Sequence, residues 1–195
     1  MRSYKDFIVS PIGKRYNNST KVGDKELVLN TEVYNHQYVN RLAKVIATPL
    51  LFSSPINMGD EVIVHHNIFR RWHDIKGREK NSRSYWRDNK YIISEDQIYL
   101  YKKEDWIAMP GFSFIKPLKE ISKFSLEDEK PLVGIIKYSD GIFKKNELVG
   151  FRPNMNCEDF INGERLYRVL NKFITIKYEY QGNEEEYNPS WAQGS

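Results

Sequence analysis

Apolar residues in this chain come in short runs that alternate with polar residues, and this pattern limits the fold more than any other feature. Successive side chains of a β-strand point to opposite faces, so a short alternating run predicts a strand with one buried face. Turn-forming residues such as Met58-Gly59-Asp60 and Asn162-Gly163 separate the runs and indicate tight connections rather than βαβ crossovers. The sequence therefore predicts an all-β fold, with strands at residues 7–9, 42–48, 61–65, 90–93, 98–101, 112–116, 132–138, 147–151, 166–169 and 174–178.

The expected strands occur twice in the same order. Four segments of the first half match four segments of the second half, at offsets that fall from 106 to 90, 86 and 76 residues. Each fall marks residues present only in the first copy, which indicates two successive β-domains with insertions in the first. Chance similarity among strand-rich segments is the alternative. The matched pairs are FIVSP ending at Pro11 with FIKP ending at Pro117, AKVIA at Ala43 with VGIIK at Val133, DEVIVH at Asp60 with NELVGF at Asn146, and YIISEDQIYLY at Tyr91 with YRVLNKFITIK at Tyr167.

The largest insertion, between Pro11 and Ala43, has no counterpart in the second copy. It contains three consecutive aliphatic residues, Leu27, Val28 and Leu29, between polar flanks rich in Asn, Gly and Asp. Because a core segment would need an equivalent in the second copy, we expect an appended mobile loop with an apolar tip. The alternative is that the segment ELVLNTEV forms a hairpin strand packed on the first domain.

The first copy resembles the co-chaperonins of the GroES family over roughly residues 5–103. The resemblance rests on an initial strand, a long loop with an aliphatic triplet, the strand AKVIATP, the Gly-Asp of GDEVIVHH and the closing segment YIISEDQIYLYK. It implies two small GroES-like β-barrel domains in tandem, and it implies that Leu27, Val28 and Leu29 dock onto the apical domains of a chaperonin ring. The expected function is a lid, itself a homo-oligomeric ring, that caps a GroEL-type chaperonin and assists ATP-dependent protein folding.

The chain departs from that family in its length and in one short connection. Residues 1–104 form the first expected domain, with the mobile loop at about 14–40 and a basic insertion at 70–89, and residues 105–181 form a second domain without the loop. Residues 182–195 form an acidic and aromatic tail that we expect to be flexible, with Tyr187 and Trp191 as alternative anchors on a neighbouring subunit. The connection LFSSPINMGD leaves little room for the family's roof hairpin, and in this it resembles the co-chaperonins of some bacteriophages.

The insertion at residues 70–89 is strongly basic. Trp72, Tyr85 and Trp86 lie among seven cations, against only Asp74 and Glu79 within residues 70–87. Basic residues with interleaved aromatics suit a phosphate backbone and stacked bases. A solvated loop or an inter-subunit contact explains the composition more simply, so we expect a basic contact surface and do not favour nucleic acid as its partner. The cations are Arg70, Arg71, Lys76, Arg78, Lys80, Arg83 and Arg87.

Catalytic and metal-binding patterns are sparse in the sequence. It has no Gly-rich phosphate loop and no nucleophile elbow, and Cys157 has no nearby base in sequence. Adjacent residues of a strand point to opposite faces, so His65 and His66 are not expected to converge on one metal ion with His73. We therefore expect a protein that is not an enzyme and has no catalytic residue, metal or cofactor.

Composition fits a protein of a reducing compartment. The chain has 195 residues, 40% of them hydrophobic, and its net charge of +4 is too small to indicate nucleic acid by itself. The single cysteine excludes an intrachain disulfide framework, and the sequence contains no apolar leader and no apolar run long enough for a membrane span. We expect a cytoplasmic protein, in the host cytoplasm if a phage encodes it.

Two other functions remain open from the sequence. Tandem β-domains with a protruding apolar arm also suit a bacteriophage virion structural or assembly protein, whose arm binds neighbouring subunits. Single-stranded nucleic-acid binding through the basic insertion would show a steep salt dependence. The arm separates the lid from the virion protein: a lid keeps residues 27–29 mobile until an ATP-loaded chaperonin is present, whereas a structural subunit keeps them buried.

Overall fold

The computed structural model describes residues 2–16, 19–22, 25–28, 39–121 and 128–189, with residues 19–22 and 26–28 described by their backbone. The described residues form β-strands and two short 3-10 turns, η2 (Glu95–Gln97) and η3 (Asn171–Phe173), so the all-β prediction is confirmed. The chain divides into two compact units, Met1–Asp105 and Trp106–Ser195. Each predicted strand corresponds to a strand of the structure, because the alternating pattern marks the buried face of each.

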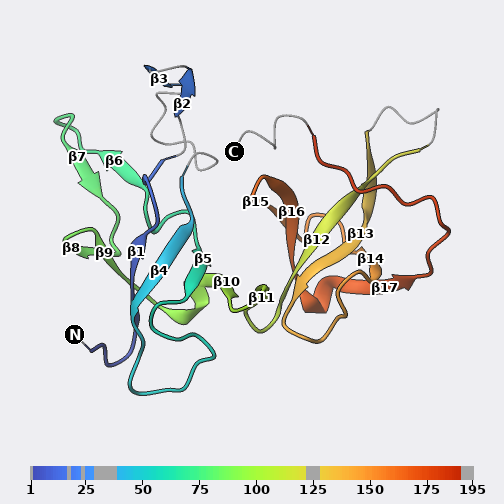
Figure 1. The fold of residues 1–195 in the computed structure, drawn as a ribbon, viewed down its shortest axis with the longest axis horizontal. Coiled ribbons are helices and arrows are strands. Elements are labelled where there is room, and N and C mark those ends of the chain that lie inside the picture. Colours follow the sequence, from blue (N-terminus) through green and yellow to red (C-terminus); the bar gives the residue numbers. More distant parts are fainter. Residues whose placement is uncertain (1, 17–18, 23–24, 29–38, 122–127, 190–195) are drawn as a thin grey trace. The chain divides into compact units, whose positions relative to one another are not determined.

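The first unit is built from the strands β1 (Phe7–Pro11), β2 (Ser19–Val22), β3 (Lys25–Val28), β4 (Leu42–Ala47), β5 (Glu61–Val64), β6 (Arg71–His73), β7 (Glu79–Asn81), β8 (Tyr85–Arg87), β9 (Lys90–Ile93) and β10 (Ile98–Lys102). Its principal sheet has the order β10-β5-β4-β1-β9-β8, and neighbouring strands are antiparallel (Figure 1). The pairs β2-β3 and β6-β7 each form a two-stranded sheet of their own. Both pairs lie in the insertions that the second copy lacks.

The second unit is built from the strands β11 (Trp106–Ala108), β12 (Phe112–Lys119), β13 (Glu129–Ser139), β14 (Leu148–Phe151), β15 (Asn156–Ile161), β16 (Glu164–Leu170) and β17 (Ile174–Tyr178). Its principal sheet has the order β17-β14-β13-β12-β16-β15. This order repeats that of the first unit strand for strand, with β12 in the place of β1 and β16 in the place of β9. In each unit a 3-10 turn, η2 or η3, precedes the last strand of the sheet. The two units therefore share one topology.

Equivalent strands also pair in equivalent register. Val9 of β1 lies opposite Tyr91 of β9, and Ile115 of β12 lies opposite Tyr167 of β16. These pairs have the offsets of 106 and 76 residues that the sequence matches give. Since side chains alternate between faces, agreement in register means that equivalent residues of these strands face the same side of their sheet.

The sequence matches of β4 with β13 and of β5 with β14 are each wrong by one residue. Pro11 lies opposite Ala43 in the first unit, and Pro117 lies opposite Gly134, rather than Val133, in the second. Ala43 lies opposite Val62 and Gly134 opposite Val149, so the offset between β5 and β14 is 87 residues rather than 86. Successive side chains of a strand point to opposite faces, so a register shifted by one residue would turn every buried side chain of β13 to the other face. Short matches between apolar segments therefore identified the strands but did not determine their register.

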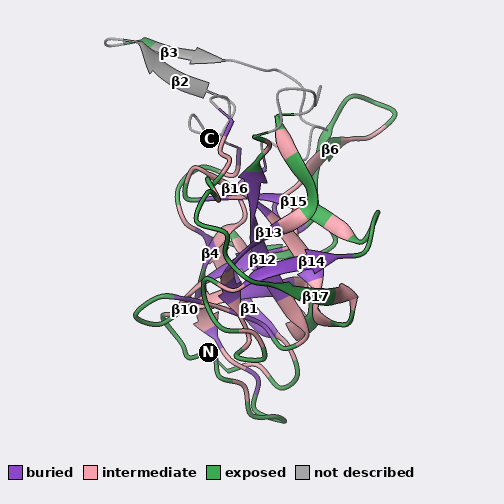
Figure 2. Ribbon diagram, turned by 90° about the vertical axis from the view of Figure 1, so that its right-hand side faces the viewer, coloured by how far each residue is buried: buried purple, intermediate pink, exposed green. Residues whose placement is uncertain are grey.

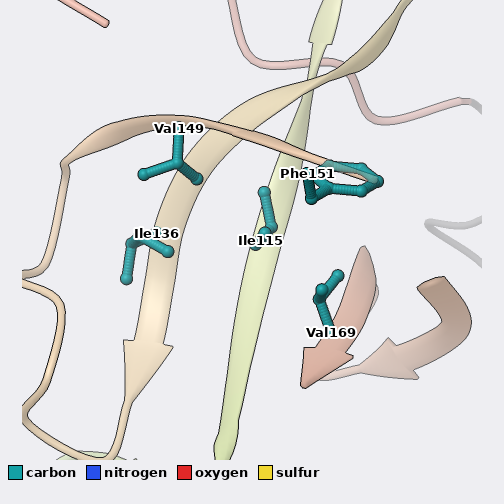
Figure 3. Packing of buried hydrophobic residues seen from close by; sticks show 5 residues of the cluster. All are labelled: Ile115, Ile136, Val149, Phe151 and Val169. Atoms are coloured by element: carbon teal, nitrogen blue, oxygen red, sulfur yellow. The ribbon is translucent and has the colours of Figure 1, made fainter. Parts of the chain in front are cut away.

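Each unit has its own buried residues. In the second unit, side chains from β12, β13, β14 and β16 meet in a cluster that is at most 5% exposed (Figure 3). Burial of an aliphatic or aromatic side chain contributes about 1.5–3 kcal/mol to folding, so this cluster is a main source of the stability of the unit. Its members are Ile115, Ile136, Val149, Phe151 and Val169, and buried residues of the first unit include Phe7, Val9, Val45, Val62 and Leu100.

Both principal sheets are open within the described part of the chain. The outermost strands that each unit itself contributes to its principal sheet are β10 and β8 in the first unit and β17 and β15 in the second, and neither pair is hydrogen-bonded together. The expected closure into β-barrels is therefore not found among these strands. Closure requires tilted strands long enough to pair across the gap, and β8 has only three residues. Figure 2 shows β17 as a largely exposed edge, in contrast to the buried strand β12.

The C-terminal strap, residues 184–189, lies along β12. The strand β16 pairs with β12 only at Phe112–Ile115. Further along β12, Tyr187 donates its N–H to Pro117 O over 2.8 Å, and Lys119 donates its N–H to Glu185 O over 2.8 Å. The expectation of a flexible tail is therefore wrong for these residues, because backbone bonds to β12 fix them in place.

Candidate functional site

The first insertion leaves the sheet and returns to it through a closed neck. Asn40 donates its N–H to Arg15 O over 2.9 Å, and Tyr16 and Val39 form an antiparallel bridge. Tyr16 and Val39 are each only 4% exposed. The residues that flank the segment 17–38 are therefore held side by side on the first unit.

The side chain of Asn40 holds this neck closed. Its Nδ2 donates to Ile12 O at 2.7 Å and to Lys14 O at 2.8 Å, while its Oδ1 accepts the N–H of Leu42 at 2.9 Å. Buried amides of this kind need such partners, and Asn40 is buried. Sequence reasoning missed Asn40. Its only signal is an Asn two residues before an apolar strand, a position from which Asn side chains commonly bond nearby backbone groups.

The strands β2 and β3 form a hairpin inside this insertion. Leu27 lies opposite Thr20 and Val28 opposite Ser19, and the connection between the strands falls at residues 23–24. The expected position at an apolar tip is therefore wrong for Leu27 and Val28, which lie in β3, the second strand of the hairpin. Leu29 lies outside the described residues.

The basic insertion also folds into a hairpin, β6-β7, with Trp72 opposite Lys80. Asp74 organises its turn: Asp74 Oδ1 accepts the N–H groups of Lys76 and Arg78, each at 2.9 Å. These N–H donors, that of Arg78 above all, lower the pKa of Asp74. Gly77 has a φ of +72°, which glycine adopts without strain. The turn therefore has a defined conformation although it is exposed.

Arg15 joins the neck to the base of this basic hairpin. Its guanidinium donates to Phe69 O from Nε at 3.1 Å and from Nη2 at 2.9 Å, and from Nη1 to Asn81 Oδ1 at 2.7 Å. Beside it, Arg71 donates its N–H to Tyr16 Oη at 2.8 Å and stacks its guanidinium on the Tyr16 ring, 4.7 Å from the centroid. The insertions that carry β2-β3 and β6-β7 therefore share one anchor, the dipeptide Arg15-Tyr16.

The structure separates the seven predicted basic residues into two groups. Arg70 and Arg71 are half-buried at the base of the hairpin, and Arg71 pairs with Glu79 at 3.1 Å. Arg70 and Arg71 therefore do not belong to an exposed contact surface, because they lie where the base of the hairpin packs on the neck. The other five are exposed: Lys76, Arg78, Lys80, Arg83 and Arg87.

The aromatic residues of the insertion are engaged within the protein. The guanidinium of Arg87 lies over the Trp86 ring at 4.2 Å, and the Tyr85 ring packs edge-on against Tyr91 at 5.4 Å. Trp72 donates its Nε1–H to the main-chain oxygen of Asn81 at 3.2 Å. Trp72 also lines a shallow cavity of about 330 Å³ together with Asn67, Arg70, Ser82 and Arg83.

Asn188 of the C-terminal strap binds a buried lysine in the second unit. Its Oδ1 accepts from Lys116 Nζ at 3.2 Å and from the N–H of Arg165 at 3.0 Å, and its Nδ2 donates to Gly163 O at 3.1 Å. Lys116 is 2% exposed, and burial lowers its pKa. The strap therefore supplies a polar partner that the buried ammonium requires.

A cavity of about 480 Å³ in the second unit contains a charged network under the strap. Arg165 pairs with Glu129 and Glu158, and its Nη2 lies 2.6 Å from Tyr167 Oη. Burial, with the nearby carboxylate of Glu129, raises the pKa of Tyr167. Because these charges satisfy one another, the network stabilises the unit, and it presents no activated nucleophile.

The histidines His65 and His66 differ from expectation. The strand β5 ends at Val64, so both residues lie beyond it, and their rings stack at 4.2 Å instead of pointing to opposite faces. Asn67 donates its N–H to His65 Nδ1 at 3.1 Å. Among the described residues, no group of three or more His, Cys, Asp or Glu side chains is placed to hold a metal ion.

An exposed apolar turn lies in the short connection after β4, a feature that sequence reasoning did not single out. Leu50 and Leu51 are 55% and 72% exposed, and both donate their N–H to Tyr4 O, at 3.1 and 3.0 Å. The signal was the run of three apolar residues between Pro49 and Pro55. This turn is an exposed apolar surface of the first unit, formed by residues 50–52.

Comparison with protein-family models, with curated proteins and with solved structures finds no match for this chain. The site therefore has to be interpreted from its own geometry. Within the described ranges, no helix is both long enough and apolar enough to cross a membrane.

Proposed function

We propose that this chain is a co-chaperonin of the GroES type, built from two related GroES-like units of which the first carries the docking hairpin. It caps a GroEL-type chaperonin as a homo-oligomeric ring in the cytoplasm, hydrolyses nothing itself and needs no cofactor. The observation that carries the proposal is the β2-β3 hairpin, which forms a sheet of its own and has Leu27 and Val28 on β3. A closed neck of backbone and Asn40 bonds holds the insertion that presents it.

The energetics suit reversible docking. Burial of three aliphatic side chains contributes about 1.5–3 kcal/mol each, whereas ordering about a dozen loop residues opposes binding by about 1–2 kcal/mol per residue. One loop therefore binds weakly. Several loops on a symmetric ring act together through their high effective concentration, and this avidity is lost when the partner changes conformation.

The test is gel filtration of the protein mixed with a GroEL-type chaperonin, with and without ATP. Co-elution only with nucleotide is expected for the native sequence, and the triple variant Leu27→Asp, Val28→Asp, Leu29→Asp should not co-elute. The control variant Leu50→Asp, Leu51→Asp changes apolar residues outside the hairpin and should still bind. If the native protein, folded and oligomeric, does not co-elute under any nucleotide condition, the proposal is wrong.

The exposed apolar turn at residues 50–52 favours a second candidate, a bacteriophage virion structural or assembly protein that binds neighbouring subunits. Such a surface suits permanent contact with other copies of the chain or with other virion proteins. In that case the variant Leu50→Asp, Leu51→Asp would lose the contacts between subunits, and the native protein would not bind the chaperonin. Sedimentation velocity of both variants separates the two candidates.

A further inference from the structure

The exposed cations of the β6-β7 hairpin have few partners inside the protein. Within the described ranges, Lys76, Arg78 and Arg83 form no salt bridge, although each is exposed. The two carboxylates of the hairpin are already used: Asp74 accepts two turn N–H groups and lies 3.8 Å from Lys80, and Glu79 pairs with Arg71. The turn therefore presents uncompensated positive charge.

The apex of this hairpin also carries an apolar side chain. Ile75, in the turn between β6 and β7, is fully exposed. It follows Asp74, whose carboxylate is used in ordering the turn, and it precedes Lys76. The turn therefore combines an exposed apolar side chain with positive charge. A surface that complements this apex is acidic and includes a small apolar contact.

The hairpin is held rigidly enough to keep its charges in place. Arg15 bonds two points of its base, Phe69 O and Asn81 Oδ1, and Ser82 Oγ donates to Ile68 O at 2.5 Å. The strands add three residue pairs to this base, a length of about 10 Å. Because the same Arg15-Tyr16 anchor closes the neck of the first insertion, both hairpins have their roots on one part of the first unit.

We propose that the β6-β7 hairpin is a second docking arm, which binds an acidic surface of the same partner protein that the β2-β3 hairpin binds. This inference rests on the proposed function and adds the charge of the partner surface. The shared anchor makes simultaneous contact by the two arms feasible, and the excess of cations matches carboxylates on the partner. Complementary charge of this kind acts mainly on the rate of association, which it raises at low ionic strength.

A protein surface fits the arm better than a single-stranded nucleic acid does. Proteins that bind single strands without sequence preference stack bases on free aromatic faces. Here the Trp86 face is covered by Arg87, Tyr85 packs on Tyr91, and the Trp72 edge is bonded to Asn81 O. Each ring is partly exposed but already has a partner within the protein, whereas Lys76, Arg78 and Arg83 form no salt bridge in the described ranges, and this difference favours carboxylates over stacked bases.

The test compares two triple variants with the same change in net charge. Lys76→Glu, Arg78→Glu, Arg83→Glu alters the arm, whereas Lys130→Glu, Lys144→Glu, Lys172→Glu alters exposed lysines of the second unit. Association rates with an immobilised GroEL-type chaperonin are measured by biolayer interferometry in ATP at low and high salt. The arm variant should associate at least about tenfold more slowly at low salt and lose most of the salt dependence, and the control should stay within about twofold.

Three outcomes decide between the alternatives. Equal association rates for the arm variant and the control overturn the second arm while leaving the proposed function intact. No binding by the native protein overturns the proposed function and the inference together. Tight, salt-sensitive binding of a fluorescent single-stranded oligonucleotide that only the arm variant loses, with unchanged chaperonin kinetics, also overturns the inference and assigns the arm to nucleic acid. Circular dichroism checks that the variants are folded. The milder double variant Lys76→Ala, Arg83→Ala removes two charges without reversing them and should also slow association if the arm binds an acidic surface.

Discussion

The first and the second unit share a strand order but place their additional residues differently. In the first unit, two insertions leave the sheet as hairpins, β2-β3 and β6-β7, anchored at Arg15-Tyr16. In the second unit the corresponding connections are shorter, and the additional segment, the C-terminal strap, bonds along β12. The same strand order therefore carries two separate hairpins in the first unit, whereas in the second unit the additional segment pairs with a strand of the unit's own sheet.

In each unit the side chain of one asparagine holds an additional segment in place. Asn40 bonds three backbone groups at the neck of the first insertion, and Asn188 bonds Lys116, Arg165 and Gly163 beneath the strap. The amide suits both places because it offers donors and an acceptor without a charge. The comparison predicts that similar substitutions in the two units will have different consequences.

The largest effect on stability is expected from Gly134→Ala. A Cβ atom at Gly134 would lie 2.4 Å from Lys116 O and 2.5 Å from Ile115 Cγ2, so β12 and β13 would have to separate. We expect a loss of about 2–3 kcal/mol confined to the second unit. The equivalent position of the first unit already holds Ala43, and Ala43→Gly should lose only about 0.5–1 kcal/mol. Hydrogen exchange read separately for the two units measures both, and equal losses would contradict the close approach.

The two asparagines give the next largest effects. Asn188→Ala leaves the buried Lys116 ammonium with one partner fewer and should lose about 2 kcal/mol. Limited proteolysis should then cleave near residues 184–189. Asn40→Ala should cost a similar amount but make residues 17–38 the site of cleavage and weaken partner binding. The same cleavage pattern from both variants would show that the two asparagines do not act on separate segments.

Arg15→Lys should have a smaller effect. Lysine keeps the charge but cannot span Phe69 O and Asn81 Oδ1 with a planar fork, so the base of β6-β7 loosens by about 1 kcal/mol. Amide exchange should quicken in β6 and β7 while the second unit is unchanged. The matched variant Arg87→Lys, on the exposed surface, is expected to leave these rates as they are. Unchanged exchange in Arg15→Lys would argue against the shared anchor.

The smallest predicted effect is a pH dependence from Lys116. Burial favours its neutral form, so between its lowered pKa and the ordinary value of 10.5 the unfolded chain binds more protons than the folded one. Stability should therefore rise slightly with pH as the pH approaches 10.5 from below. Lys116→Met should remove the slope in urea unfolding midpoints. A slope that persists in the variant would assign the effect to another group.

The sequence predicted five strands of each principal sheet, because each of these strands is defined by its own alternating pattern, but it missed β8 in the first sheet and β15 in the second. An alternating run such as residues 61–65 shows its buried face without reference to the rest of the chain. The sequence also did not predict β6 or β7, which like β8 are three residues long and contain no buried residue that would give an alternating pattern. It also misplaced Leu27 and Val28, since the mostly polar residues of β2 give no alternating signal that would reveal the hairpin.

What the sequence determined by itself is the all-β class, the order of the main strands and their repetition in the two halves, but not the register of every match. What only the tertiary structure decided is which distant groups meet: Arg15 with Asn81, Tyr16 with Arg71, and Asn188 with Lys116. Strand periodicity is local and can be read over a few residues. The partner of a side chain 55 to 72 residues away depends on strand register and on which backbone groups the sheet leaves unpaired, and both are fixed only when the whole sheet forms.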